Sequence, residues 1–249
     1  MYLICMKGYY NMDLTSPRTI RNIQEQFGFT FKKGLGQNFL TARNILEEIV
    51  DAAEIESGVI EVGPGFGVLT SELAQNSDKV VTIEIDERLI DVLDYTLAEY
   101  DNVKIINEDI LKLDLTKVID DEFNGEKVSI AANLPYYITT PIITKLLEEK
   151  LPIKNIVVMV QKEVAERMSA KPSTKDYGAI TVLCQYYTEP SIVANVPASL
   201  FVPPPKVDSA VLKLKVLDKP SVEVKDEGVF FRVVKAAFSQ RRKTLLNCL

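Results

Sequence analysis

Short apolar runs alternate with amphipathic helical patterns through the middle of the chain, from residue 58 to residue 160. Strands are expected at 59–62, 80–84, 103–106, 128–132 and 156–160, and helices at 68–74, from 86 to 97 and at 142–147. This alternation predicts an α/β fold with a mostly parallel sheet and helices on both of its faces. Ligands of such sheets bind beyond the carboxyl ends of the strands, so residues that follow a strand are the first candidates for function.

The segments on either side of this region have a different pattern. Before it, Thr15-Ser16-Pro17 opens a short helix that is expected to end near Phe27, because proline suits the first turn of a helix. A basic, glycine-containing loop at 32–40 follows, and Thr41 is expected to cap a second helix. After residue 178, strands are expected at 192–196 and 207–216, a boundary at 218–220 and a helix at 227–239.

Composition excludes several classes of protein and of chemistry. The chain has 249 residues, of which 47% are hydrophobic and 26% charged, as in globular proteins with a sizeable core. It has no apolar run near the ~20 residues of a membrane span, and its apolar start lacks a basic leader and a cleavage site. Three scattered cysteines predict a reducing cytoplasm and no metal. The absence of histidine excludes His general bases, Ser-His triads and His metal sites in this chain.

Charge is unevenly distributed along the chain, although the net charge of −6 at first argues against a nucleic-acid partner. Residues 1–43 carry six basic and two acidic side chains, residues 44–130 carry six and 22, and residues 131–249 carry 17 and 11. A polyanion would avoid the acidic middle and approach the basic flanks. A solvated surface with uneven charge would give the same counts. The charge distribution is therefore supporting evidence for an RNA partner and does not establish one.

A glycine-rich turn, 61–67, follows the first expected strand and opens a helix with the sequence Glu-Val-Gly-Pro-Gly-Phe-Gly. Glycines at alternate positions let the backbone turn tightly and approach a ligand closely. The third glycine comes one residue too early for the dinucleotide-binding fingerprint. The turn is weak evidence alone, and its meaning depends on the residues at the next strand ends.

Carboxylates stand at the ends of the next two strands. Glu84 lies 21 residues after Gly63, where an acidic side chain can bind both hydroxyls of a ribose. Asp109 ends the third strand beside Ile110, and its carboxylate can accept a hydrogen bond from an adenine amine. No basic phosphate-binding group accompanies them, so S-adenosylmethionine fits better than NAD. A helix cap at Glu84–Asp86 and a turn role for Asp109 are the structural alternatives.

The fourth expected strand is followed by Asn133-Leu134-Pro135-Tyr136. We expect the Asn133 side-chain oxygen and the Leu134 carbonyl to accept the two hydrogens of an exocyclic amine, because Pro135 restricts the backbone there. Tyr136 offers a flat face for the ring of the base, and Phe201 is the second candidate for this clamp. An ordinary strand-to-helix turn is the alternative for the tetrapeptide, and a core position is the alternative for Phe201.

Together these motifs resemble the KsgA family, the small-subunit ribosomal RNA adenine dimethyltransferases. The matching segments run in order over residues 30–215: 35–40, 61–67, Glu84, Asp109, 133–136, 161–164 and 201–211. The resemblance implies a Rossmann-like methyltransferase domain at 30–217, after an N-terminal extension and helix at 1–29. It also implies a small C-terminal helical domain at 218–249, which in the family extends further, so weaker RNA docking is expected.

The resemblance also implies roles for individual residues. The catalytic set is Asn133, Leu134, Tyr136 and Phe201, and the cofactor-binding set is Asn38, Leu40, Gly63, Gly65, Glu84, Asp109, Ile110 and Asn133. Candidate phosphate contacts are Lys32, Lys33, Arg43, Lys162, Arg167, Lys206, Arg241 and Arg242.

The expected substrate is a pair of adjacent adenosines near the 3′ end of 16S rRNA, each methylated twice by a monomeric cytoplasmic enzyme. Three alternatives stay open. The first is a 23S rRNA methyltransferase of the macrolide-resistance type, which usually has Asn-Ile-Pro-Tyr where this chain has Asn-Leu-Pro-Tyr. The second is a non-catalytic ribosome assembly factor, since a fold does not determine a function. The third is a small-molecule methyltransferase.

Overall fold

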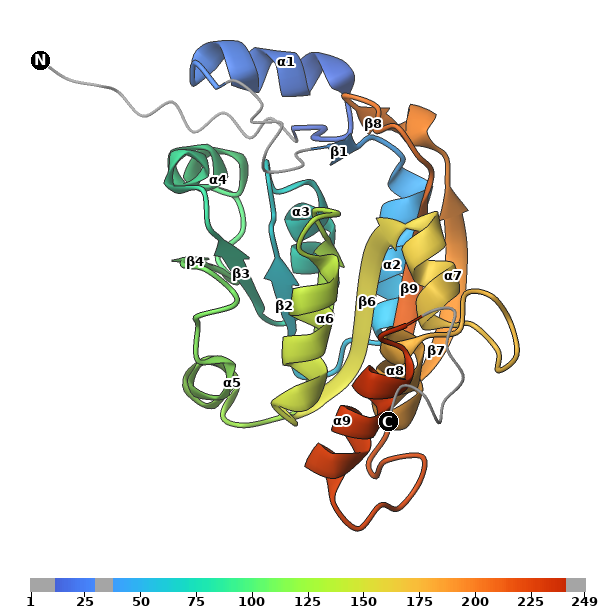
Figure 1. The fold of residues 1–249 in the computed structure, drawn as a ribbon. Helices are drawn as coiled ribbons and strands as arrows, with labels where there is room; N and C mark the ends of the chain where they lie inside the picture. Colours follow the sequence, from blue (N-terminus) through green and yellow to red (C-terminus); the bar gives the residue numbers. More distant parts are fainter. Residues whose placement is uncertain (1–11, 30–37, 241–249) are drawn as a thin grey trace, which may run out of the picture.

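The computed structural model of the chain describes residues 12–29 and 38–240, and its centre is a seven-stranded sheet with helices on both faces (Figure 1). The strand order is β4-β3-β2-β5-β6-β9-β7. In that order the strands span Val103–Asn107, Val80–Glu84, Val59–Val62, Val128–Asn133, Ile153–Gln161, Ser209–Val216 and Thr188–Val196. The five strands from β4 to β6 are parallel, whereas β9 is antiparallel to both β6 and β7. The predicted mostly parallel sheet is therefore confirmed, with an antiparallel pair at one edge.

Two hydrophobic cores lie on the two faces of the sheet, because side chains alternate along each strand. In β6, Val157 and Met159 face one core, and Ile156, Val158 and Val160 face the other. The first core is covered by α2 (Arg43–Ala53), α3 (Val68–Gln75) and α4 (Ile90–Thr96). The second is covered by α5 (Leu115–Phe123), α6 (Thr139–Glu148), α7 (Lys162–Met168) and α8 (Ala179–Tyr187).

The first and last described helices lie at opposite ends of the molecule (Figure 1). Helix α1 (Pro17–Gln26) buries Ile20 and Ile23 in the first core. Helix α9 (Glu227–Ala237) packs against α8 through aromatic rings, with Tyr186 and Phe230 5.2 Å apart between ring centroids. No helix within 12–29 and 38–240 is long and apolar enough to span a membrane. The predicted domain boundaries near 29 and 217 stay predictions.

A short antiparallel pair joins distant parts of the chain at the end of the sheet near α1. Strand β1 (Phe39–Leu40) pairs with β8 (Phe201–Val202), so that Leu40 lies opposite Phe201. The Thr41 hydroxyl strengthens this junction by donating to the Leu200 carbonyl at 2.8 Å. The predicted capping role of Thr41 is therefore wrong: Ala42 occupies the cap position of α2 and the hydroxyl is used elsewhere.

Most other predicted elements are confirmed, with differences at their ends. Strand β5 includes Asn133, which the sequence pattern placed just after it. The predicted helix after Asp86 begins as a short 3-10 turn, Glu87–Leu89, which Asp86 caps by accepting from the Arg88 N–H. Two helices, α5 and α8, were not predicted. An acidic residue favours the first turn of a helix, so a helix start was expected at Glu163, and α7 does begin there, at Lys162.

We predict that Ser129→Ala lowers the free energy of unfolding by about 0.5–1.5 kcal/mol. The Ser129 hydroxyl is buried in β5 and donates to the Ala53 carbonyl at the end of α2 at 2.6 Å. The Asn155 amide also donates to that carbonyl, at 3.0 Å, so the loss is partial. Urea unfolding followed by circular dichroism measures the change. The exposed Ser221→Ala is the control, and equal stability of both variants would contradict the prediction.

Candidate active site

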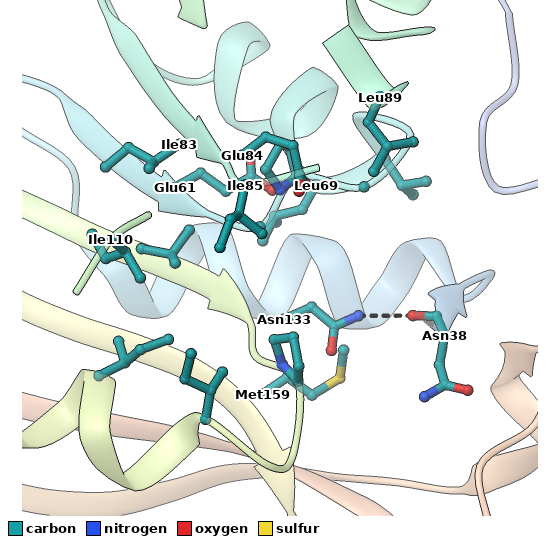
Figure 2. Close-up of a pocket in the computed structure, with 18 of the residues that line it drawn as sticks. Asn38, Glu61, Leu69, Ile83, Glu84, Ile85, Leu89, Ile110, Asn133 and Met159 are labelled. Carbon is teal, nitrogen blue, oxygen red and sulfur yellow. Dashed lines mark hydrogen bonds between the residues drawn. The ribbon is translucent and has the colours of Figure 1, made fainter. Parts of the chain in front are cut away.

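One pocket lies at the carboxyl ends of the parallel strands, where the sequence pattern placed the functional residues (Figure 2). The space inside it is about 1060 Å³, a figure that includes its open mouth. All eight residues of the predicted cofactor set line it: Asn38, Leu40, Gly63, Gly65, Glu84, Asp109, Ile110 and Asn133. Five segments far apart in sequence therefore meet at one site. That these residues bind a cofactor stays a prediction, whereas their proximity is a finding.

The glycine-rich turn between β2 and α3 forms the floor of the pocket. Gly63, Gly65 and Gly67 have φ values of 71°, 60° and 82°, a region that L side chains rarely adopt. At Gly65 a Cβ atom would lie 2.8 Å from the Phe39 ring, so the turn also has no room for a side chain at this position. The Phe39 ring itself stacks on Phe66, with 4.3 Å between centroids. The turn is thus shaped both by backbone conformation and by an aromatic packed directly against it.

Glu84 ends β3 with its carboxyl inside the pocket and 5% of the residue exposed. The carboxyl accepts a hydrogen bond from the Asp86 N–H at 2.8 Å. Burial raises the pKa of Glu84, and the backbone N–H groups of Asp86, Gly65 and Ile85 lower it in part. Its bond to Gly65 ties the second strand end to the glycine turn. A buried carboxyl held by backbone donors is suited to bind hydroxyl groups of a ligand.

Glu61 is a second buried carboxyl in the pocket, and the sequence reasoning assigned it no role. It lies on β2 and is 1% exposed, and burial raises its pKa to about 8. The hydroxyls of Thr70 and Thr82 lie beside it and lower the pKa in part, whereas the charge of Glu84 raises it further. Among the described residues, Glu61 Oε2 has no hydrogen-bond partner of good geometry. Glu61 is therefore neutral at pH 7 and brings a polar but uncharged group to the site.

Asp109 and Ile110 form one side wall of the pocket. Asp109 accepts from the Leu111 N–H at 3.0 Å and lies 3.7 Å from Lys112 Nζ. It therefore stabilises a turn, which was the alternative role considered for it. Its carboxyl also lines the pocket, together with the buried Ile110. Ile85 lines it from the neighbouring strand end and is 54% exposed. Two isoleucines and a carboxylate offer an apolar slot with one polar end, which suits a purine base.

The residues of the pocket fit S-adenosylmethionine better than a phosphate-containing cofactor. Besides the neutral Glu61, three acidic side chains line the described pocket, Glu84, Glu108 and Asp109, and none of its described lining residues is Lys or Arg. Such a lining repels phosphates and attracts positive charge. S-adenosylmethionine carries a sulfonium and an ammonium group, and the sequence predicts that Glu84 binds its ribose and that Asp109 and Ile110 contact its adenine. The donor set therefore agrees with the cofactor that the sequence predicted.

Asn133 lies at the end of β5, on the opposite side of the pocket from Glu84 (Figure 2). Its amide nitrogen donates to the Asn38 main-chain carbonyl at 3.1 Å. Because an amide is planar, this bond turns the side-chain oxygen of Asn133 away from Asn38 and leaves it able to accept. Leu134 is 1% exposed, and its N–H donates to the Met159 carbonyl at 3.1 Å, which anchors the following turn to β6.

The two predicted clamp residues lie outside the pocket lining. Tyr136 is half-buried, and its hydroxyl is 2.9 Å from Ser209 Oγ. Phe201 is 2% exposed in β8, among core side chains, so a base could reach its ring only if neighbouring side chains moved. The clamp role of Phe201 stays a prediction, and in this conformation the ring is not accessible to a base. Tyr137, which the sequence reasoning did not single out, lines the pocket and is 59% exposed.

The candidate phosphate contacts divide into paired and unpaired groups. Arg167 forms an ion pair with Glu163 at 2.7 Å, and Arg43 lies within 4 Å of Asp13 and Glu72. Lys162 and Lys206 have no ion pair within the described residues. Lys32, Lys33, Arg241 and Arg242 lie outside the described residues. Within residues 12–29 and 38–240, no group of three or more Cys, Asp or Glu side chains is arranged to hold a metal ion.

Comparisons with known proteins identify close relatives. Residues 28–249 match the family model described as ribosomal RNA adenine dimethylase. The chain is 56% identical to "Ribosomal RNA small subunit methyltransferase A" of Bacillus mycoides (strain KBAB4) over 240 residues, which are 95% of this chain and 82% of that protein. The Bacillus cereus (strain B4264) protein of the same name matches equally well.

Two solved structures share the fold. A dimethyladenosine transferase from Plasmodium falciparum is 33% identical with a TM-score of 0.68, over 84% of this chain and 74% of that one. The 23S rRNA methyltransferase ErmE is 30% identical, also with a TM-score of 0.68, over 84% of this chain and 82% of that one. The predicted Rossmann-like methyltransferase fold is thereby confirmed.

We predict that Gly65→Ala weakens binding of S-adenosylmethionine at least tenfold. The added Cβ would meet the Phe39 ring at 2.8 Å, and an alanine with φ near 60° costs about 1–2 kcal/mol. Isothermal titration calorimetry gives the dissociation constant. Gly178→Ala is the matched control, since nothing lies within 4 Å of a Cβ there and its φ is negative. Equal affinities for the two variants would show that the turn tolerates a side chain.

We predict that Glu61→Gln becomes more stable relative to the wild-type protein as pH rises from about 5 to 8. The folded pKa of about 8 lies above the unfolded value, so folding takes up a proton between the two. In the wild-type protein, the contribution of Glu61 to the free energy of unfolding is fully present at low pH. It falls as pH rises, by at most about 1.4 kcal/mol per pH unit. Glutamine stays neutral throughout. Urea unfolding at four pH values tests this, and a constant difference between the proteins would contradict it.

Proposed function

This chain belongs to the ribosomal RNA adenine dimethylase family, and from that premise we propose that it dimethylates two adjacent adenosines near the 3′ end of 16S rRNA. The methyl groups are transferred to the exocyclic amines from S-adenosylmethionine. The substrate is the RNA within the small ribosomal subunit, so the activity belongs to the cytoplasm and to ribosome biogenesis. We further propose that the enzyme acts as a monomer and without a metal.

The observation that carries the proposal is the orientation of the Asn133 amide at the edge of an acidic pocket. An adenine amine is a poor nucleophile because its lone pair is delocalised into the ring. If Asn133 Oδ1 and the Leu134 carbonyl accept its two hydrogens, the nitrogen becomes more tetrahedral and its lone pair turns toward the pocket. The Asn38 carbonyl supports this role, because it accepts one N–H of the amide and so directs the amide oxygen toward the substrate.

When bound, S-adenosylmethionine supplies a methyl group attached to a positively charged sulfur. The residues proposed to hold it are those of the acidic pocket, with Glu84 toward the ribose, Asp109 and Ile110 toward the adenine, and the turn at 63–65 beneath. Catalysis by Asn133 is then a matter of positioning and electrostatics, which the sheet provides through fixed strand ends. The amine proton leaves to water after transfer, so no histidine is needed.

The target base must leave its stack in the RNA to reach this pocket. Tyr136 is proposed to stack on the base, a contact worth roughly 1–3 kcal/mol in other nucleic-acid-binding proteins. Lys162 and Lys206 are the described members of the phosphate-contact set whose charges are not taken up by an ion pair. Lys162 begins α7 directly after β6, the strand next to β5 and Asn133 in the sheet, so a contacting phosphate would lie near the bound base.

A large-subunit target is the second candidate, because ErmE shares the fold with the same TM-score as the Plasmodium falciparum transferase. Fold similarity therefore does not separate the two substrates. Sequence identity does favour the small subunit, at 56% against 30% for ErmE. A non-catalytic assembly factor would not need the oriented amide at Asn133.

We predict that the protein transfers labelled methyl groups to adenosines of small-subunit RNA, and that Asn133→Ala lowers kcat about 100-fold or more. Unmethylated 30S and 50S subunits are incubated separately with methyl-labelled S-adenosylmethionine, and the RNA is digested to locate dimethyladenosine. Asn76→Ala is the control, because this exposed asparagine ends α3 and lies outside the pocket lining.

Each outcome of this experiment has a distinct meaning. Label on the large subunit would replace the proposed substrate with that of the resistance-type relatives. Cofactor binding without label on either subunit would indicate an assembly factor. Equal rates for wild type and Asn133→Ala would refute the assigned role of the amide.

A further inference from the structure

We propose that Ser209 is a positioning residue for methyl transfer, which holds the Tyr136 ring in place for the target base through the hydrogen bond between the two hydroxyls. The inference rests on the proposed function, because it assumes that Tyr136 contacts the base. Tyr136 Oη and Ser209 Oγ are 2.9 Å apart and come from segments 73 residues apart in sequence.

Ser209 is among the most firmly held residues near the site. It is the first residue of β9 and is 1% exposed. Strands pair with it on both sides, since it lies opposite Gln161 of β6 and opposite Val196 of β7. An anchor of this kind does not move with the loop that it holds. By contrast, Tyr136 lies in the turn between β5 and α6, where the backbone has no strand partner.

The anchor and the amide of Asn133 belong to one sheet. Asn133 pairs with Met159 of β6, and the next residues of β6 pair with the start of β9. The distance between the amide oxygen and the ring anchor is therefore set by strand spacing and not by the turn that joins Asn133 to Tyr136. A base whose amine is held by Asn133 would contact the Tyr136 ring, and the hydroxyl end of that ring is already held by Ser209.

The neighbours of Ser209 extend the same role to the surrounding loops. The Asp208 carboxylate accepts from the Ala198 N–H at 2.9 Å, and the Asp208 carbonyl accepts from the Lys162 N–H at 3.0 Å. The start of β9 thus joins the turn at Tyr136, the segment before Phe201 and the start of α7. Burial raises the pKa of the Tyr136 phenol, so it stays protonated at neutral pH and keeps its hydrogen bond.

Fixing the ring before the substrate arrives lowers the entropy cost of binding the base productively. A bond that served only to satisfy a buried hydroxyl would affect stability and leave the reaction unchanged in the folded protein. The two roles are separable, because Tyr136→Phe keeps the ring and removes only its hydroxyl. Ser209→Ala removes the other partner of the same bond.

The test is a double-mutant cycle on kcat/KM for unmethylated small subunits, well below the melting temperature of every variant. We expect Ser209→Ala and Tyr136→Phe each to lower kcat/KM about 3- to 10-fold, with an unchanged dissociation constant for S-adenosylmethionine. We expect the double variant to be no slower than the slower single variant, because both changes break one bond. Losses that multiply, or full activity of Ser209→Ala, would overturn the proposal.

Thr188→Val is the matched control for stability. This threonine of β7 is also buried, and its hydroxyl donates to the Cys184 carbonyl at 2.7 Å, away from Tyr136. It should lower the melting temperature and leave kcat/KM unchanged. If it slows the reaction as much as Ser209→Ala does, general destabilisation explains both effects and the positioning role fails.

An NMR measurement that needs no substrate separates this inference from the proposed function. Tyrosine-ring signals are recorded for the free protein, and Tyr136→Phe assigns the Tyr136 resonances. We expect Ser209→Ala to shift these resonances and to speed the flipping of that ring, whereas Thr188→Val leaves them in place. Unchanged signals in Ser209→Ala would overturn the positioning role even in an active enzyme. Shifted signals in a protein without RNA methylation would support the anchor while the proposed function fails.

Discussion

The hydrogen-bonded register of the parallel strands is the constraint on which the whole site depends. Glu61 lies opposite Thr82 on one side and Ala131 on the other, and Asn133 lies opposite Met159. These pairings bring the ends of β2, β3, β4 and β5 to one edge, where their next residues can share a ligand. A slip of one strand by one residue would turn each of its side chains to the other face of the sheet. The residues that this strand contributes to one core would then point into the other.

The pocket combines negative charge with neutral polar groups in a way that suits a cation. Glu84 is buried yet receives several backbone donors, whereas the neighbouring Glu61 is protonated at neutral pH. The charge of Glu84 helps to raise the pKa of Glu61, and protonation of Glu61 removes the repulsion between the two carboxylates. The pocket therefore stays negative enough to attract a positively charged ligand, although one of its acidic side chains is protonated.

Sequence reasoning succeeded where local pattern decides and failed where distant contacts do. The strands are short and rich in Val and Ile, and the glycine turn, Glu84 and Asn133 stand at their ends, so their meeting in one pocket followed from topology. The partner of Thr41 is Leu200, which no local pattern reveals. The covered ring of Phe201, the pKa of Glu61 and the exposure of Tyr137 likewise depend on packing across the chain.

The pairing of β1 with β8 has a consequence for the order in which a new chain is completed. Asn38 directly precedes β1, and its carbonyl orients Asn133, yet the partner strand at 201–202 is synthesised about 160 residues later. At 5–20 residues per second, a ribosome needs roughly 10–30 s to cover that interval. The cofactor edge formed by β2, β3 and β4 can assemble well before then. The Asn133 amide would gain its orienting partner only after residues 201–202 have been synthesised, and the part of the pocket wall formed by Asn38, Phe39 and Leu40 would be fixed at the same stage.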